Sequence, residues 1–315
     1  MDKTGLEFGF AWLFAIIVGA AILFMAIYAV TQLIDSGEKE TTSKVAVEFA
    51  NVLDPLQSVV SESKGGYVDL FVEARIFNSC NLEGNFGNSV VSFSEKISFG
   101  GGWTKRGLEK RTNNAYLFSE NQMQGERVEF LTFPFNMPYK AGDILIAYTD
   151  NYCIVNAPSG VKNELKFLTG DGDKVIFVQN TGECNRETKS VCFSGSCDVK
   201  VQCSNSLCNS GYVDKEGKRL YFSDKLIYAA IFSSAENYEC NVHRLVKRLG
   251  IVSDIYSKKS AFTSNRGCVN VNIRPAILSL KESTNSYEEL SDLIIIESLA
   301  KEIDDKNEVL ECQLY

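Results

Sequence analysis

The sequence predicts an α+β protein with an N-terminal transmembrane helix continuing into an amphipathic helix, a β-rich disulfide-braced head and a helical C-terminal part. Three observations predict this class. Residues 8–30 form an apolar run without a charge, alternating apolar residues recur in the middle of the chain, and a helical spacing returns near its end. The predicted domains are the signal-anchor 1–40, the stalk 41–66, the β-rich extracellular domain 67–222 and the helical part 223–315 packed on it.

The apolar run FGFAWLFAIIVGAAILFMAIYAV predicts the transmembrane helix. At 1.5 Å per residue it reaches roughly 34 Å, which covers a hydrocarbon core about 30 Å thick. Trp12 and Tyr28 lie near its ends, where amphipathic rings favour the membrane interface. The run is longer than the apolar part of a cleavable signal, although Ile27 and Ala29 fit the positions before a cleavage site.

The orientation of this helix follows from the cysteines rather than from the flanking charges. Lys3 precedes the run, and Lys39 and Lys44 follow it, so the positive-inside rule gives close to a tie. All ten cysteines lie in the long domain beyond the run, and disulfides persist outside the cytosol. We therefore expect a single-pass protein of the cell membrane, with a cytoplasmic N-terminus and an extracellular C-terminal domain.

Five small residues of the apolar run fall on one face of the predicted helix. Small residues at four-residue spacing let two helices approach closely. This face is therefore predicted to pack against a second copy of the chain or against another membrane helix, in addition to the lipid bilayer. The five residues are Ala11, Ala15, Gly19, Ala26 and Ala29.

The net charge narrows the range of partners. The chain carries a net charge of −8 at pH 7. Residues 1–40 hold two lysines and five acidic residues, a net charge of −3, which leaves −5 for the remainder. A weakly acidic ectodomain argues against nucleic acid as a partner. We expect a protein or a surface ligand instead.

The elements of the head follow in order from periodicity. Apolar residues at helical spacing predict the amphipathic helix after residue 41, and Pro55 is expected to kink or end it. The stretch 211–222 predicts a hairpin around residues 215–218, and a short helix is expected between residues 157 and 170. The remaining strands are expected at 67–77, 89–99, 127–135, 143–155, 174–179 and 191–202.

The chain then becomes helical. Ser233 and Glu236 have the spacing of a capping box, which predicts a helix start at this point. An apolar stripe follows on one face of that helix. A last helix or pair of helices is expected after Pro275. The stripe consists of Tyr238, Val242, Leu245, Val246, Leu249, Val252 and Tyr256.

The ten cysteines are candidates for disulfides: Cys80, Cys153, Cys184, Cys192, Cys197, Cys203, Cys208, Cys240, Cys268 and Cys312. Four of them form a dense cluster, Cys192-x4-Cys197-x5-Cys203-x4-Cys208. Four thiolates can hold zinc, but the central gap is far shorter than zinc-binding pairs use. Nested or neighbouring disulfides that stiffen a hairpin are the favoured interpretation, with zinc as the alternative.

Cys240 lies nearly opposite the apolar stripe of its helix, whereas a free thiol normally lies with the apolar face. It is therefore expected to reach a partner on a segment that crosses the helix, with Cys268 and Cys312 as the candidates. Cys80 is expected to pair with Cys153 or Cys184.

Catalytic motifs are absent from the sequence. His243, the only histidine, lies beside Arg244, Lys247 and Arg248, which predicts a solvated basic face. A serine or cysteine triad would have to use this single residue. No G-x-S-x-G, H-E-x-x-H or Walker sequence occurs. We expect no catalytic residue and no cofactor.

Two stretches resemble known archaeal proteins. The N-terminus KTGLEFGFAWLFAIIVGAAILFMAIYAV resembles archaeal type IV pilin-like proteins, in which a peptidase cuts just before the hydrophobic stretch. The resemblance implies a cut after Gly5, although Thr4 separates Gly5 from Lys3 and Phe10 occupies a position that is acidic in the family. The segment NYECNVHRLVKRL and the end of the chain resemble single-pass membrane proteins of small-genome (DPANN-type) archaea, which implies no particular activity.

Three functions remain open from the sequence. The first is a non-enzymatic, membrane-anchored extracellular protein that acts as a structural or interaction protein through its ectodomain. The second is a pilin-like subunit whose N-terminal helix assembles into a filament or a membrane complex. The third is an extracellular enzyme of unknown chemistry.

Overall fold

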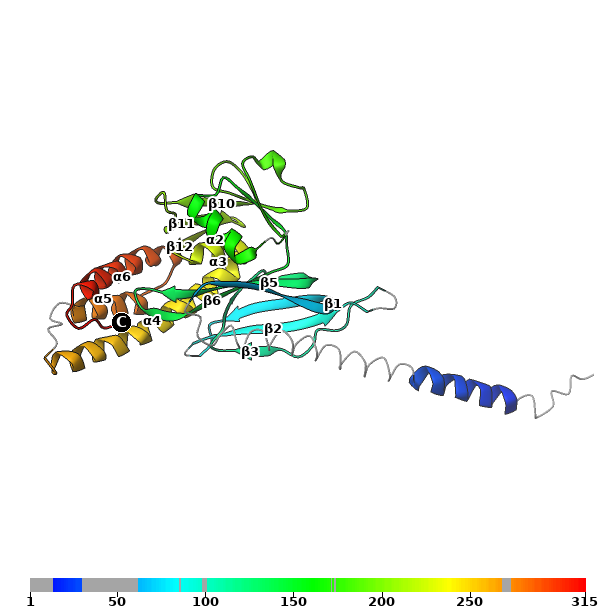
Figure 1. The fold of residues 1–315 in the computed structure, drawn as a ribbon. Helices are drawn as coiled ribbons and strands as arrows, with labels where there is room; N and C mark the ends of the chain where they lie inside the picture. The colour runs from blue at the N-terminus through cyan, green and yellow to red at the C-terminus, as the bar shows by residue number, and fades with distance from the viewer. Residues whose placement is uncertain are drawn as a thin grey trace, which may run out of the picture.

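The computed structural model describes residues 14–29, 62–84, 86–97, 101–170, 172, 174–267 and 273–315. These residues form a mixed α+β structure, which confirms the α+β part of the prediction (Figure 1). Two six-stranded sheets lie beside a group of C-terminal helices.

The first sheet has the strand order β3-β2-β1-β5-β6-β4. Its neighbours are antiparallel except β4 and β6, which run parallel. Alternate residues of β1 are buried, among them Val68, Leu70 and Ile76, which confirms the strand pattern predicted for this stretch. Its strands are β1 (Lys64–Asn81), β2 (Asn88–Glu95), β3 (Lys110–Thr112), β4 (Tyr116–Phe118), β5 (Gln122–Asn136) and β6 (Lys140–Tyr148).

The second sheet has the order β12-β11-β10-β9-β7-β8. The four strands from β10 to β8 run parallel, and helix α2 (Ser159–Thr169) makes the crossover between β7 and β8. β11 and β12 form the predicted hairpin. The strands are β7 (Tyr152–Val155), β8 (Val175–Val178), β9 (Lys189–Cys192), β10 (Val199–Cys203), β11 (Ser210–Lys215) and β12 (Lys218–Ser223), with a 3-10 turn η1 at Thr181–Glu183.

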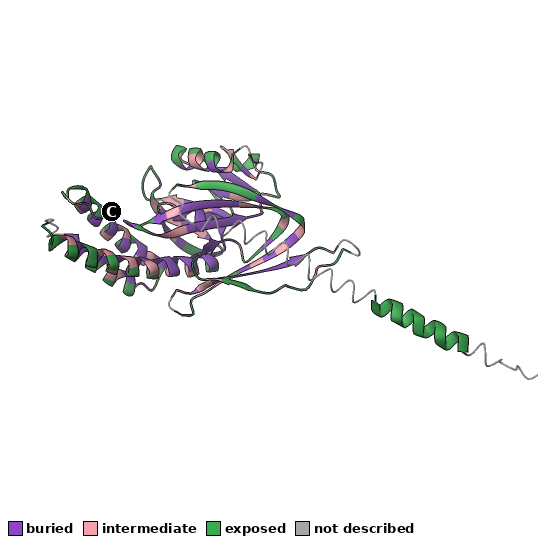
Figure 2. Ribbon diagram, turned by 60° about the horizontal axis from the view of Figure 1, so that its bottom comes forward, coloured by how far each residue is buried: buried purple, intermediate pink, exposed green. Residues whose placement is uncertain are grey.

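One helix connects the two sheets. α4 (Ala235–Ser264) packs against β1, β4 and β6 of the first sheet, against β12 of the second, and against α5. Its stripe from Tyr238 to Leu249 is buried in a core that both sheets share (Figure 2). The other C-terminal helices are α3 (Leu226–Phe232), α5 (Ile273–Asn285) and α6 (Leu293–Glu308), with a 3-10 turn η2 at Leu290–Asp292.

Two predicted strands are each divided in the structure. The stretch 143–155 contains the end of β6 and all of β7, which belong to different sheets. Asp150 and Asn151 separate them, and both residue types favour turns. The stretch 191–202 contains β9 and β10, and Gly195 between them has a φ of 97°, which only glycine adopts easily.

Two predicted helix starts are displaced. The N-cap of α4 is Ser234, whose side chain accepts a hydrogen bond from the Asn237 N–H. Ser233 cannot serve there because it ends α3, and its N–H and hydroxyl both donate to the Ala229 carbonyl. α5 begins at Ile273, with Pro275 inside its first turn, where the missing N–H breaks no helical hydrogen bond.

The N-terminal apolar run is described over residues 14–29. These residues are helical, and all of them are exposed (Figure 2). In the part of the chain covered by the structure, no helix combines the length and the apolar character needed to cross a membrane. Ala15, Gly19, Ala26 and Ala29 lie in this helix, whereas Ala11 lies outside the described residues.

Other predictions also fall outside the described residues. The pilin-type cleavage position at Gly5 is one of them, and Cys268 is another. The predicted stalk is described only from residue 62, and β1 already begins inside it at Lys64.

Candidate binding site beside the Cys80–Cys240 disulfide

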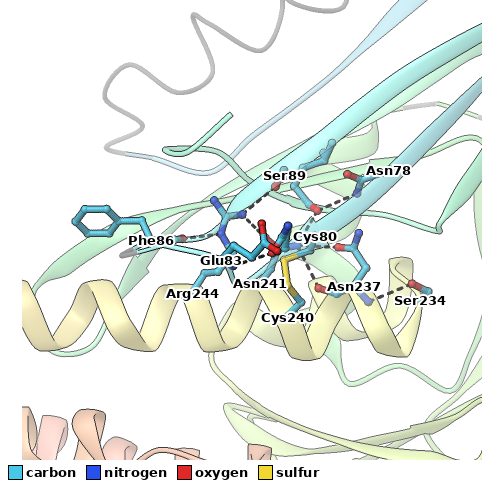
Figure 3. The surroundings of a disulfide bond; sticks show 12 residues. Asn78, Cys80, Glu83, Phe86, Ser89, Ser234, Asn237, Cys240, Asn241 and Arg244 are labelled. Carbon is cyan, nitrogen blue, oxygen red and sulfur yellow. Dashed lines mark hydrogen bonds between the residues drawn. A yellow bond between two sulfur atoms is a disulfide. The ribbon is translucent and has the colours of Figure 1, made fainter. Parts of the chain in front are cut away.

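A long-range disulfide joins the first sheet to the connecting helix. Cys80 lies near the end of β1 and Cys240 lies in the second turn of α4, with Cα atoms 6.0 Å apart (Figure 3). The pairing of Cys80 with Cys153 or Cys184 was therefore wrong. Those two residues pair with each other in the region of the second sheet, away from β1.

The pairing predicted for Cys240 was also wrong, although it does meet a segment that crosses its helix. That segment is β1, and not the chain around Cys268 or Cys312. Cys312 is itself disulfide-bonded.

The dense cysteine cluster forms neighbouring disulfides. Cys192 pairs with Cys197 and Cys203 pairs with Cys208. This pairing overturns the zinc alternative, because a disulfide sulfur has no thiolate to offer a metal. Among the described residues no group of three or more histidine, cysteine or acidic side chains could hold a metal ion.

The burial of Arg244 contradicts the prediction that it belongs to a solvated basic face. It follows the disulfide by one turn of α4 and is fully buried, whereas its neighbour Lys247 is exposed. Its guanidinium makes five hydrogen bonds of 2.8–3.0 Å, all to neutral oxygens of the first sheet, its loops and α4. Burial lowers the pKa of Arg244 to about 10. The acceptors are the carbonyls of Phe86, Asn113 and Ala115, the hydroxyl of Ser89 and Oδ1 of Asn241.

Arg244 fixes the direction of two amides on α4 (Figure 3). A guanidinium only donates, so Asn241 must turn its Oδ1 toward Arg244, at 2.8 Å. The Nδ2 of Asn241 then donates to Oδ1 of Asn237, also at 2.8 Å. The Nδ2 of Asn237 is left as a buried donor without a partner among the described residues.

The amide of Asn78 on β1 is also fixed, but here the donor is held and the acceptor is left unpaired. Its Nδ2 donates to the Leu117 carbonyl at 3.1 Å and to the Ser119 hydroxyl at 2.9 Å. A carbonyl only accepts, so Oδ1 of Asn78 faces the other way and is a buried acceptor that no described residue satisfies. Asn78 is 3% exposed and Asn237 is 1% exposed.

Both amides line a cavity of about 230 Å³, which we call the amide cavity. Cys80 borders it, and Phe77 and Val90 contribute apolar wall. Its exposed rim carries three charged side chains and the amide of Asn121. The charged rim residues are Arg106, Glu109 and Glu236.

A larger hollow of about 740 Å³ is also lined by a cysteine of this disulfide, and we call it the acidic cleft. Glu236 borders both hollows, and Cys240 borders the cleft. His243 contacts Tyr287 edge to face here, with ring centroids 5.3 Å apart. Burial and then the charge of Lys247 lower the pKa of His243, which favours a neutral ring. Four glutamates line the cleft: Glu236, Glu239, Glu288 and Glu289.

A buried lysine lies outside both hollows. Lys215 at the end of β11 donates to the carbonyls of Ile231 and Ser233, where α3 ends. A cation at a helix C-terminus is favourable, since the last carbonyls have no partner in the helix. Burial lowers the pKa of Lys215, although Glu120 lies 3.7 Å from its Nζ. We interpret Lys215 as a cap of α3.

Sequence reasoning missed the residues that build the amide cavity. Of the four basic residues between positions 105 and 111, only Arg106 borders it. The other three are Lys105, before β3, and Lys110 and Arg111, in β3. A signal was present, because Asn237, Asn241 and Arg244 have the spacing of one helical face. No protein-family model, curated protein or solved structure matches the chain.

Proposed function

We propose that the protein is a membrane-anchored extracellular interaction protein that acts through contacts of its disulfide-braced head, without catalysis. The observation that carries the proposal is the presence of four disulfides between described residues, one of which joins residues 160 positions apart. Disulfides form and persist in oxidising compartments. A head braced in this way fits the outer side of a membrane.

The anchor is the apolar run of residues 8–30. Exposed side chains such as Phe14, Leu23 and Phe24, each more than 60% accessible, need an apolar environment that the head does not provide. Lipid fits this requirement, because the run has no charge and its full length as a helix matches a bilayer core.

The acidic cleft is the contact surface that we assign to the head. Glu239 forms an ion pair with Lys218, and Arg219 also lines the cleft. The other three glutamates of the cleft would attract a basic segment of a partner, and the half-buried Tyr221 offers apolar contact area. A binding role is supported by the surroundings of His243. This residue has a tyrosine ring as its neighbour, and no serine, cysteine or carboxylate of the described residues hydrogen-bonds to it.

The location is tested with the full chain in intact cells, using a membrane-impermeant thiol reagent and carbonate extraction. We expect no labelling before reduction, labelling from outside after reduction, and retention in the membrane pellet. Ten free thiols in the native protein would contradict the proposal, and so would release by carbonate or a head that only permeabilised cells expose to the reagent.

A pilin-like subunit is the second candidate. It is supported by the exposure of every residue from 14 to 29, since such a helix can be covered by copies of itself. An accurate mass of the N-terminus separates the two candidates. A chain that begins at Leu6 supports the pilin-like subunit, and a chain that begins at Met1 supports the simple anchor.

A further inference from the structure

We propose that the acidic cleft of one molecule binds residues 105–111 of a second copy of this chain. These residues run along the free side of β2 and into β3, the outermost strand of the first sheet, and we call them the basic edge. The proposal rests on the binding function assigned to the cleft, and it names the partner. It does not depend on the membrane anchor.

The basic edge presents an apolar side chain that its own chain leaves uncovered. Leu108 is 95% exposed, the highest value among the large hydrophobic residues that the structure describes. The backbone around it is ordered, because the Gly107 N–H donates to the Phe93 carbonyl and β3 pairs with β2. Binding therefore requires little ordering of the chain. Single exposed leucines are common, so the neighbouring charges have to identify the partner.

The charges of the basic edge are mostly unpaired. Its four cations and Glu109 give a net charge of +3, in a chain whose net charge is −8. Arg111 lies 3.6 Å from Glu109, but the other three cations form no ion pair with a described residue. All three are exposed, so an acidic partner can reach them. They are Lys105, Arg106 and Lys110.

The acidic cleft provides the complementary surface. Glu236, Glu288 and Glu289 line it, are exposed, and form no ion pair with a described residue. Leu82, which is 41% exposed, and the half-buried Tyr221 line the same cleft and offer apolar surface to a leucine side chain. The volume of about 740 Å³ lies within the range of roughly 300–1,000 Å³ typical of ligand sites. The cleft therefore has room for Leu108 together with its basic neighbours.

The basic edge and the acidic cleft lie on adjacent parts of one molecule. Arg106 and Glu236 both border the amide cavity, and Glu236 also borders the cleft. No ion pair between described residues joins the two surfaces within the molecule, so both are open to a second copy. A two-fold axis between two copies would place each basic edge on the other cleft, and the same contact would form twice. The contact therefore closes as a dimer and does not extend into a chain.

The test compares two charge-reversed variants of the full, oxidised chain in detergent. The edge variant is Lys105→Glu/Arg106→Glu, and the cleft variant is Glu236→Lys/Glu288→Lys. All four positions are exposed, so the changes should leave the fold intact. Sedimentation velocity over a range of concentrations measures the dissociation constant of the dimer. We expect each variant alone to dimerise at least about tenfold more weakly than the unchanged chain.

Mixing the two variants separates this contact from association of the N-terminal helices. In a mixed pair the reversed edge faces the reversed cleft, and the original edge faces the original cleft, so both contacts again join opposite charges. We expect the mixture to recover the affinity of the unchanged chain. The N-terminal helices are identical in both variants and cannot produce this recovery. A mixture as weak as its components would overturn the proposal, and so would an unchanged chain that is monomeric at every attainable concentration.

Two further variants test the apolar contact and the effect of net charge. Leu108→Ser changes an exposed side chain and should weaken the dimer at least about tenfold. Arg186→Glu/Lys301→Glu makes the same charge change as the edge variant at exposed positions outside both surfaces, and should leave the affinity unaltered. An unaltered dimer with Leu108→Ser, or equal weakening by the control, would contradict the proposal. Assemblies larger than a dimer would contradict the two-fold arrangement.

Failure of this proposal is distinguishable from failure of the proposed function. A monomeric head that thiol labelling still places outside the cell would rule out the second copy as the partner of the cleft, and the extracellular location would stand. A dimer that forms as expected in a protein labelled only after permeabilisation would have the opposite meaning.

Discussion

The double variant Cys80→Ala/Cys240→Ala is expected to lower the free energy of unfolding by about 5 kcal/mol. This disulfide closes a loop of 160 residues, and the entropy that cross-linking removes from the unfolded chain grows with the logarithm of loop length. Three smaller disulfide loops lie inside this loop. Discounting their residues barely changes the value, because the dependence is logarithmic.

The matched control is Cys203→Ala/Cys208→Ala. This disulfide joins residues five positions apart, and the same relation gives about 2 kcal/mol. Both double variants remove two sulfur atoms and one bond. The difference of about 3 kcal/mol between them therefore isolates loop length.

The assay is guanidinium unfolding of the oxidised chain in detergent, followed by circular dichroism. The Cys80–Cys240 variant should also show a steeper dependence on denaturant, because its unfolded state is less compact. Equal losses in the two double variants would refute the argument from loop length, and an unchanged free energy of unfolding in the Cys80–Cys240 variant would refute it as well.

Two further predictions concern buried and paired charges. Arg244→Met removes the donor of five hydrogen bonds to the first sheet, its loops and α4, so it should cost about 3–5 kcal/mol of unfolding free energy. Arg248→Met removes a single bond to a carbonyl and should cost about 1 kcal/mol, so equal losses in denaturant unfolding would contradict the role of Arg244. Hydrogen bonds from Lys258 and Lys281 lower the pKa of Asp254 to about 2, below its value in the unfolded chain. The stabilisation from this pair is therefore complete above about pH 4 and lost as the pH falls toward 2. Asp254→Asn should weaken the dependence of the melting temperature on pH over that window. An unchanged dependence would refute the role assigned to Asp254.

Local periodicity was enough to predict most elements. Alternation in β1 and the hairpin of β11 and β12 are properties of neighbouring residues, and the stripe from Tyr238 to Leu249 is a property of one helix. The boundaries that failed depended on tertiary context. Ser233 and Ser234 are chemically identical candidates for the N-cap, and only the end of α3 at Ser233 decides between them.

Disulfide pairing between distant segments could not be predicted from local sequence patterns. Cys80 and Cys240 meet because β1 is a central strand of the first sheet and α4 crosses that sheet, and strand order is not encoded in any single segment. The amide cavity is hidden for the same reason. Asn78 comes from β1, and Asn237 comes from α4. Arg244 looked like a surface charge because its five acceptors are mostly backbone carbonyls, which leave no mark in a sequence.

The spacing of the Cys80–Cys240 bond has a consequence for biogenesis. If the head crosses the membrane in the order of its sequence, Cys80 reaches the oxidising compartment first. Its partner Cys240 follows 160 residues later. The cysteines from Cys153 to Cys208 emerge in the interval and can capture it. Under the extracellular location that we propose, the native pairing therefore requires that any such premature bond be reshuffled by thiol–disulfide exchange once the helix bearing Cys240 has arrived.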